Sequence, residues 1–334
     1  MALTTRWGIL GTGWIAQKFA TGLRVLSDAE LVAVGSRTEA TAHAFADQFG
    51  APRRHASYEA LAHDPDVDVV YVSTPHSLHK DNTVLCLNAG KPVLCEKPFT
   101  INARETETLI ACARERKLFL MEAMWTRYLP IIVQARQWLS DGTIGEVRMV
   151  EVDFGFRAEF NPASRLFDPA LGGGALLDIG IYTVSLASMV FGGPPTRIAG
   201  MAHLGATGVD EQSAMILGYG RGELAILSCA VRTHTPQEAC IIGTEGFIKI
   251  HSPFWCATTA TLSVSGQDEQ RVEMPHTGNG YNYEAEEVMR CLRAGALESE
   301  VMPLDESLSI VRTMDQVRAQ WGLRYPMEAV TSDQ

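Results

Sequence analysis

The sequence feature that most constrains the fold is a glycine-rich turn near the N-terminus. A short apolar run, 7–10, ends in Gly11-Thr-Gly-Trp-Ile-Ala16, and apolar residues at helical spacing follow. In such a strand–turn–helix unit the first glycine makes the turn, the second lets a pyrophosphate approach the backbone, and the small third residue lets helix and strand pack. The pattern predicts a dinucleotide site, and a plain tight turn is the alternative. The residues expected at the phosphates are Gly11, Thr12, Gly13, Trp14 and Ile15.

The chain around this turn alternates between two kinds of segment. Short apolar runs expected as strands (7–10, 31–34, 67–73, 93–95 and 118–121) are separated by segments expected as helices (15–23, 38–49, 78–87 and 103–116). Continuous apolar strands separated by helices indicate a parallel sheet that is covered on both faces. We therefore predict an α/β fold with a doubly wound Rossmann domain over residues 1–122.

After residue 122 the pattern becomes that of an α+β domain. Strands are expected at 146–156, 196–204, 213–219, 224–231, 238–250, 260–264 and 270–274, and helices at 129–139, 175–190, 283–293 and 304–321. Turn residues such as Gly142 and Gly145 separate these segments. The second domain, residues 123–334, is therefore predicted to carry a large, mostly antiparallel open sheet.

The composition excludes several classes of protein. The 334 residues contain 28 Lys and Arg against 39 Asp and Glu, a formal charge of −11, which removes the diffuse attraction to phosphate backbones that nucleic-acid binders need. No secretory leader is expected, and because Asp178 interrupts the most apolar run, 175–191, no membrane association is predicted. The seven cysteines form no CxxC pair, so we expect reduced thiols in a cytoplasmic protein.

The end of the second expected strand bears on the choice of dinucleotide. NAD-preferring sites usually place a carboxylate there for the ribose hydroxyls, whereas an arginine accommodates a 2′-phosphate. Here the chain reads Val34-Gly-Ser-Arg-Thr38 and has no carboxylate before Glu39. Ser36, Arg37 and Thr38 could offer two hydroxyls and a guanidinium to that phosphate. The sequence favours NADP over NAD, and a solvated arginine on a loop is the alternative.

Glu96-Lys-Pro98 follows another expected strand, at the sheet edge where ligands bind in open α/β folds. Lys97 can donate to a substrate hydroxyl and stabilise a developing alkoxide, provided that Glu96 or the cofactor orients it. A surface ion pair would explain the same residues.

A second chemical motif is Gly172-Gly-Gly-Ala-Leu-Leu-Asp-Ile-Gly-Ile-Tyr182. Asp178 and Tyr182 are four residues apart and share a helical face. The carboxylate can fix a substrate hydroxyl while the phenol exchanges a proton. An unperturbed tyrosine has a pKa near 10, so it needs a cation such as Lys97 to act as a base at neutral pH. The alternative is a half-buried aromatic residue beside a local hydrogen-bond acceptor.

Taken together, the glycine turn, Glu96-Lys-Pro98 and the segment from Gly172 to Tyr182 resemble the Gfo/Idh/MocA oxidoreductase family over essentially the whole chain. The segments 93–98, 119–127 and 173–182 are most similar to its dihydrodiol dehydrogenase and NADP-dependent D-xylose dehydrogenase branch. The resemblance implies an NADP-binding N-terminal domain and a C-terminal domain whose open sheet faces a partner subunit in a homodimer or higher homo-oligomer. It also implies hydride transfer at a carbinol carbon of a sugar, polyol or trans-dihydrodiol.

The same resemblance assigns roles to single residues. Lys97 matches the catalytic lysine of the family, and Asp178 matches the aspartate that orients substrate. Tyr182 stands where many relatives carry histidine and matches the tyrosine proton donor or acceptor of the branch. Arg165, shortly before the glycine triplet, is expected to contact cofactor or substrate. Because Tyr182 replaces the commoner histidine, the substrates of inositol-type or glucose-6-phosphate-type relatives are a weak guide to the substrate of this chain.

Other candidates follow from position along the chain. Ser73-Thr-Pro-His-Ser-Leu-His79 ends a strand, which places Thr74, Pro75, His76 and His79 over the cofactor, beside Glu96 and Lys97. No metal is expected at the two histidines, because no third ligand is close in sequence and hydride transfer needs none. Aromatic faces suit sugars and arene diols, although core packing explains each candidate equally well. These candidates are Trp125, Phe154, Trp255 and Tyr281, with Arg127 and Phe156 beside them.

Three functions remain open from the sequence. The leading hypothesis is an NADP-dependent dehydrogenase or reductase acting on CH–OH groups. A sugar reductase or sugar–sugar oxidoreductase with tightly held NADP is the second, and a non-catalytic NADP-sensing regulatory protein is the third.

Overall fold

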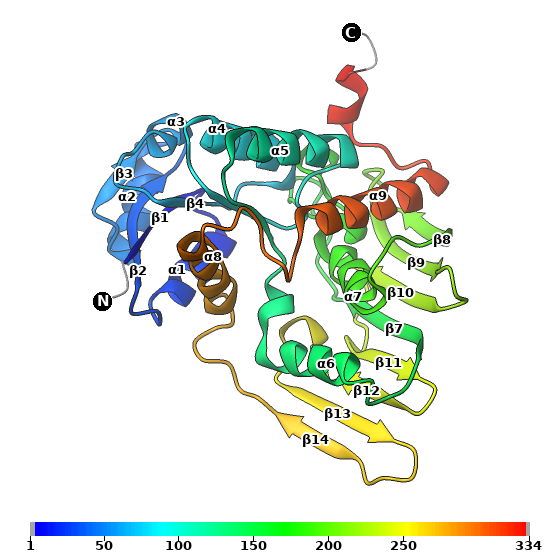
Figure 1. The fold of residues 1–334 in the computed structure, drawn as a ribbon. Helices are drawn as coiled ribbons and strands as arrows, with labels where there is room; N and C mark the ends of the chain where they lie inside the picture. The colour runs from blue at the N-terminus through cyan, green and yellow to red at the C-terminus, as the bar shows by residue number, and fades with distance from the viewer. Residues whose placement is uncertain (1–3, 332–334) are drawn as a thin grey trace. The chain divides into compact units, whose positions relative to one another are not determined.

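A computed structural model describes residues 4–331, with side chains through residue 328 (Figure 1). The chain forms two compact units. The first contains the chain up to Thr100 together with Arg104–Tyr128 and Thr277–Ser307, and the second contains Ile101–Ala103, Leu129–His276 and the chain from Leu308 onward. The sequence predicted one boundary near residue 122, whereas the chain passes between the compact units several times.

The first unit is built on a six-stranded parallel sheet of order β3-β2-β1-β4-β5-β6. Its strands are β1 (Thr5–Leu10), β2 (Ala29–Gly35), β3 (Arg53–His55), β4 (Val69–Val72), β5 (Val93–Glu96) and β6 (Leu120–Ala123). Every residue of β4, β5 and β6 is buried, as expected for strands covered on both faces. The strand order turns back between β1 and β4, which is where such sheets bind ligands. The predicted doubly wound sheet is confirmed.

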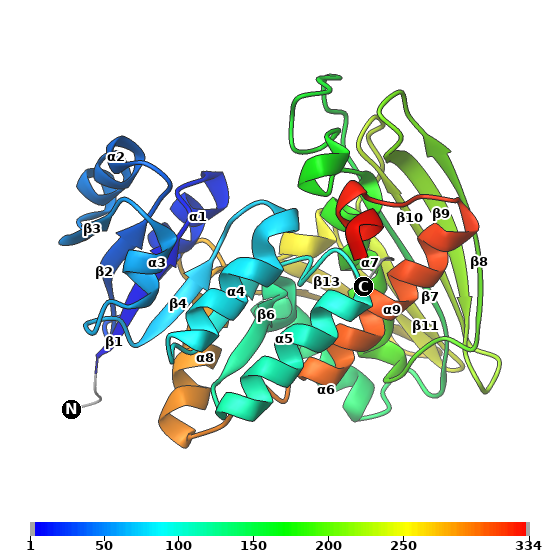
Figure 2. The same cartoon turned by 90° about the horizontal axis from the view of Figure 1, so that it is seen from above.

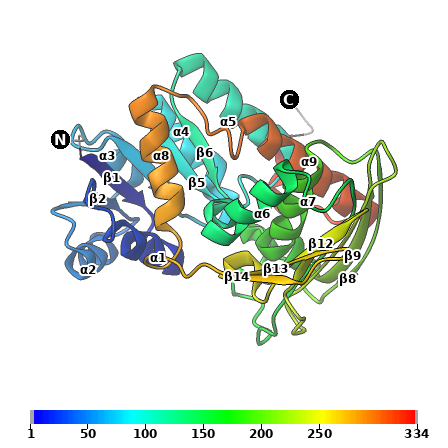
Figure 3. The same ribbon diagram turned by 60° about the horizontal axis from the view of Figure 1, so that its bottom comes forward.

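Helices α1 (Trp14–Leu23), α2 (Glu39–Phe49), α3 (Tyr58–Ala62), α4 (His79–Asn88), α5 (Ala103–Arg116) and α8 (Asn282–Ala294) accompany this sheet. The short helices η1 (His76–Leu78) and η2 (Trp125–Tyr128) lie at strand ends. Helix α8 comes from far along the sequence yet packs on α1 and η2, and Figures 1 and 3 show it beside α1. Its strongly amphipathic sequence requires such a partner surface, and this return explains why one sequence boundary does not separate the units.

The second unit is built on an eight-stranded sheet of order β14-β13-β12-β11-β7-β10-β9-β8. Its strands are β7 (Val147–Gly155), β8 (Arg197–Leu204), β9 (Asp210–Gly218), β10 (Leu224–Ala230), β11 (Ala239–Gly243), β12 (Gly246–Ile250), β13 (Thr259–Val264) and β14 (Gln270–Glu273). Strands β7 and β10 pair in parallel and all other neighbours are antiparallel. This confirms the predicted large, mostly antiparallel sheet.

Helices cover one face of this second sheet. The unit contains α6 (Pro130–Ser140), α7 (Ile181–Phe191), most of α9 (Leu304–Gln320) and short helical turns, and α7 packs on β7 and β10 (Figure 2). Along β8 every second residue is exposed, so the opposite face of the sheet is open. The segment Pro169–Phe191 is long and apolar enough to cross a membrane by length and composition alone, but 83% of its most apolar window is buried inside the protein.

Some elements differ from the sequence prediction. The single strand expected at 238–250 is the hairpin of β11 and β12, which turns at Thr244 and Glu245. The short elements β3 and α3 were not predicted, because Arg53–His55 offers no apolar run and α3 is only five residues long. The helix expected from residue 175 begins as a π-helical turn, Leu176–Gly180, before α7.

Candidate active site

The two glycines of the N-terminal turn have different structural tasks. Gly11 has a φ of +105°, and a Cβ there would lie 3.0 Å from Ser73 Oγ and 3.1 Å from the Ser73 carbonyl carbon. Gly13 has an ordinary φ of −75°, and a Cβ there would meet nothing within 4 Å. The turn itself therefore needs Gly11, while Gly13 leaves space in front of α1.

Helix α1 offers that space an unneutralised N-terminus. Its first turn contains no acidic residue, and its N-cap residue, Gly13, has no side chain with which to cap the helix. The first backbone N–H groups of a helix and its dipole attract anions. This cradle fits the pyrophosphate of a dinucleotide. Beside it the Trp14 side chain is 66% exposed and Ile15 is half-buried.

A chain of hydroxyls joins the turn to the end of β2. Thr12 Oγ1 lies 3.2 Å from Ser36 Oγ, which lies 2.6 Å from Thr41 Oγ1. Thr38 caps α2 by accepting the Thr41 N–H at 3.3 Å. Arg37 is exposed beside them. The structure thus brings Thr12 and Ser36 together, as a shared ribose and phosphate site requires, and leaves the Arg37 guanidinium at the surface.

His79 connects the ends of β4 and β5. It is fully buried, with Nδ1 2.8 Å from the Pro98 carbonyl oxygen and Nε2 2.8 Å from the Thr74 carbonyl oxygen. Burial lowers the pKa of His79 to about 4, so the ring is neutral at physiological pH. His79 was predicted to contact the cofactor, but its ring is enclosed. It can therefore affect cofactor binding only indirectly, by holding the loops of Thr74 and Pro98. His76 is also buried, and no group of at least three potential metal-ligating residues occurs in the described part of the chain.

The loop that carries Lys97 is fixed from several sides. Tyr71 on β4 stacks on Phe19 with ring centroids 3.8 Å apart and donates its hydroxyl proton to Glu96 Oε1. The other carboxylate oxygen of Glu96 accepts the backbone N–H of Lys97 at 3.1 Å. Glu96 therefore holds the backbone of the predicted catalytic lysine. Sequence reasoning missed Tyr71, whose only signal was a hydroxyl in an apolar strand.

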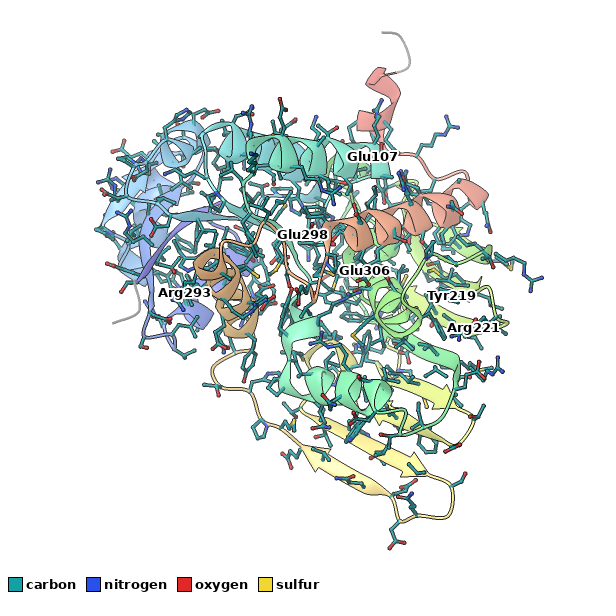
Figure 4. All side chains as sticks on the ribbon, viewed as in Figure 1. Glu107, Tyr219, Arg221, Arg293, Glu298 and Glu306 are labelled. Atoms are coloured by element: carbon teal, nitrogen blue, oxygen red, sulfur yellow. The ribbon has the colours of Figure 1, made fainter. Side chains whose placement is uncertain are left out.

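Glu122 at the end of β6 supports the same loop. It is fully buried and accepts the Phe99 N–H at 3.1 Å. Burial raises the pKa of Glu122 to about 7 against the opposing effects of Ser307 and Arg127. Arg127 is itself 3% exposed and donates to Glu306 at 2.6 Å, a residue labelled in Figure 4. Arg127, expected beside the substrate, thus lies in a buried ion pair.

In the second unit the structure joins Arg165 to Asp178. Asp178 lies in the π-helical turn, is 4% exposed, and accepts a hydrogen bond from Arg165 Nη1 at 2.7 Å. The Arg165 side chain remains 56% exposed. A π-helical turn inside an α-helix is rare and often marks a functional site. The sequence predicted Asp178 and Tyr182 on one continuous helix, but it did not indicate that the helix is π-helical at Asp178.

The predicted substrate aromatics form two groups. In the second unit, Phe154 stacks on Trp255 with centroids 5.2 Å apart, and the Tyr182 ring lies 5.5 Å from Phe154 and 6.5 Å from Trp255. In the first unit, Trp125 stacks on Tyr281 at 4.2 Å. Each group offers flat apolar surfaces of the kind that suits sugar and arene rings.

Both parts of the chain match models of known protein families. Residues 5–124 match an oxidoreductase family with an NAD-binding Rossmann fold, and residues 132–249 match the Gfo/Idh/MocA C-terminal domain. The chain is 40% identical over 335 residues to a trans-1,2-dihydrobenzene-1,2-diol dehydrogenase of Xenopus tropicalis, covering 97% of this chain and 100% of that protein.

Solved structures with the same fold include other oxidoreductases. An aldose-aldose oxidoreductase from Caulobacter crescentus, complexed with glycerol, superposes with a TM-score of 0.87 at 25% identity over 96% of this chain and 98% of that chain. A 3-ketoreductase from Actinomadura kijaniata, in complex with NADP and TDP-benzene, superposes with a TM-score of 0.84 at 26% identity over 95% and 97%.

Proposed function

This chain belongs to the Gfo/Idh/MocA family of oxidoreductases, and from that premise we propose that it is an NADP-dependent dehydrogenase of sugars, polyols or trans-dihydrodiols. The observation that carries the proposal is the cradle at Gly13 on the same sheet edge as Lys97. The α1 N-terminus would hold the pyrophosphate of a dinucleotide, and the loops after β4 and β5 would hold its nicotinamide half.

The preference for NADP rests on the end of β2. Arg37 is exposed there and Ser36 is the last buried residue, with no carboxylate before Glu39 to hold a ribose hydroxyl pair. A guanidinium binds a 2′-phosphate through charge-assisted hydrogen bonds.

The chemistry assigned to the chain's own side chains is proton transfer and orientation. When bound, the nicotinamide supplies the hydride acceptor or donor. Tyr182 exchanges the proton of the substrate hydroxyl, and Lys97 stabilises the developing alkoxide. Asp178 accepts a hydrogen bond from a substrate hydroxyl, and Arg165 donates to Asp178 Oδ1. Phe154 and Trp255 exclude water around the Tyr182 phenol.

A substrate panel tests the proposal. The purified protein is mixed with NADP and, separately, D-xylose, D-glucose and a trans-dihydrodiol, and with NADPH and 1,5-anhydrofructose, while absorbance at 340 nm is followed. We expect NADP-linked turnover of at least one compound, with slower turnover when NAD or NADH is supplied. Absence of turnover in every mixture, with NADPH binding intact, would contradict the dehydrogenase and favour the NADP-sensing regulatory protein.

A sugar–sugar oxidoreductase is the second candidate, favoured by the similarity to the aldose-aldose oxidoreductase. Such an enzyme retains its nucleotide between two half-reactions. Nucleotide absorbance that stays with the protein through gel filtration, together with sugar-dependent reduction of a second sugar, would support it over the dissociating dehydrogenase.

We also propose that the protein is a homodimer formed through the open face of the second sheet. Met201, Ile216 and Ile226 are 82%, 48% and 41% exposed, and Ile216 lies directly opposite Ile226 across β9 and β10. A contiguous apolar area of this kind usually marks an interface. All seven cysteines are free thiols, which supports a reducing compartment such as the cytoplasm.

A further inference from the structure

A buried carboxylate holds the backbone where the π-helical turn Leu176–Gly180 begins. Asp210, at the start of β9, is fully buried, and its Oδ2 accepts the Leu176 N–H at 2.7 Å. Gly174 has a φ of +114°, and a Cβ there would collide with Asp210 Oδ1. Leu176 lies two residues before Asp178 and opens the π-helical turn. The Asp210 carboxylate therefore occupies the place of a helix cap, contributed by a distant strand.

The C-terminal segment holds the same turn from another direction. Tyr325 is 1% exposed and donates its hydroxyl proton to the Gly173 carbonyl oxygen at 2.8 Å. The guanidinium of Arg318 lies 5.4 Å from the centroid of the Tyr325 ring and forms ion pairs with Glu328 and Asp315. Arg318, held by these two ion pairs, therefore packs against the Tyr325 ring and fixes its position.

We propose that Asp210 and Tyr325 are positioning residues that hold the backbone from Gly173 to Leu176 and thereby set the place of Asp178 and Tyr182. The proposal rests on the proposed function, because it assigns work to those two side chains. It adds two residues that touch neither substrate nor cofactor.

The cost of burying Asp210 indicates that more than packing is involved. Its Oδ1 is buried without a hydrogen-bond partner in the described part of the chain, and burial raises the pKa of the carboxyl to about 7. The titratable groups that face it are the Tyr325 hydroxyl and the Cys229 thiol, neither of which is a cation. A half-satisfied buried carboxyl costs folding free energy, so its retention indicates a specific task. Its one hydrogen bond to another residue is with the Leu176 N–H, at the start of the π-helical turn.

The test compares Asp210→Ala, Asp210→Asn and Tyr325→Phe with the control Glu211→Gln. Glu211 is the next residue of β9 and pairs with Arg232 at 3.7 Å, and it makes no hydrogen bond to the backbone from Gly173 to Leu176 among the described contacts. The first readout is amide hydrogen exchange over residues 172–182, which needs no activity. The others are NADPH affinity, kcat and KM.

We expect Asp210→Ala to speed exchange in this segment roughly tenfold, because the Leu176 N–H loses its partner. Its kcat should fall about 10- to 100-fold with NADPH affinity unchanged, because the proton-transfer group is misplaced. Asp210→Asn keeps an acceptor oxygen and should recover most of both losses. Tyr325→Phe should show a smaller loss of the same kind, and Glu211→Gln none.

Unchanged exchange over 172–182 in Asp210→Ala and Tyr325→Phe overturns the proposal, as does unchanged kcat in an active wild type. If Asp210→Ala fails to fold, Tyr325→Phe decides alone. If the wild type turns over no substrate but the variants show the expected changes in exchange, the proposed function is contradicted. The role of Asp210 and Tyr325 in holding the backbone from Gly173 to Leu176 is then still supported.

Discussion

Replacing Gly13 by alanine separates nucleotide binding from folding. The backbone there has a φ of −75°, which alanine adopts without strain, and the added Cβ meets no protein atom within 4 Å. We expect the free energy of unfolding to change by less than about 1 kcal/mol, the usual scale at a helix N-cap. The methyl group would instead occupy the space of a phosphate oxygen. Losing one charge-assisted hydrogen bond there costs about 1.5–3 kcal/mol, or roughly 10- to 150-fold in NADPH affinity.

Gly11→Ala is the matched comparison in the same turn. Its φ of +105° and the contact with the Ser73 backbone at 3.1 Å make alanine strained. We expect this variant to lose about 1–3 kcal/mol of folding stability. Urea unfolding followed by circular dichroism measures stability, and a fluorescence titration measures NADPH binding. Wild-type NADPH affinity in Gly13→Ala would refute the reasoning, because the glycine would then be only part of a turn.

Three further predictions concern the cofactor, a buried carboxyl and the oligomer. Arg37→Ala should raise the Michaelis constant for NADP by at least about tenfold and that for NAD much less; equal losses would exclude a 2′-phosphate contact. The pKa of Asp210 in the folded protein is raised to about 7, so the wild type loses folding stability as pH rises from about 4 to 7, whereas Asp210→Asn lacks this loss. The melting temperature of Asp210→Asn relative to that of the wild type should therefore increase between pH 5 and pH 8. A difference that stays constant over this range would contradict the assigned pKa. Ile216→Asp should convert a dimer to a monomer in light scattering, whereas an unchanged mass would place the interface elsewhere.

The sequence predicted those features that depend on local pattern. The glycine turn, the covered parallel strands and the alternating strands of the second sheet each leave a periodic trace within a short window. The return of α8 to the first unit leaves none, because amphipathic spacing shows that a helix packs but not on what. The short strand β3 is polar and also lacks a local signal.

The sequence proposes the chemical groups of the site but not the residues that support them. Lys97, Asp178 and Tyr182 stand out by residue type and motif, whereas Asp210 and Tyr325 contact Leu176 and Gly173 across long stretches of sequence. Nothing in the pattern around Asp210 distinguishes it from a surface carboxylate. The π-helical turn at Leu176–Gly180 is likewise invisible in the spacing of apolar residues, because it changes the period over only a few positions.

The most direct test of the account is the turnover number of Tyr182→Phe at saturating NADP and substrate, in a variant shown to bind NADPH like wild type. Phenylalanine keeps the ring beside Phe154 and Trp255 and removes only the hydroxyl. If Tyr182 transfers the substrate proton, kcat should fall about 10²- to 10⁴-fold. A kcat within a few-fold of wild type would contradict the proposed role of Tyr182.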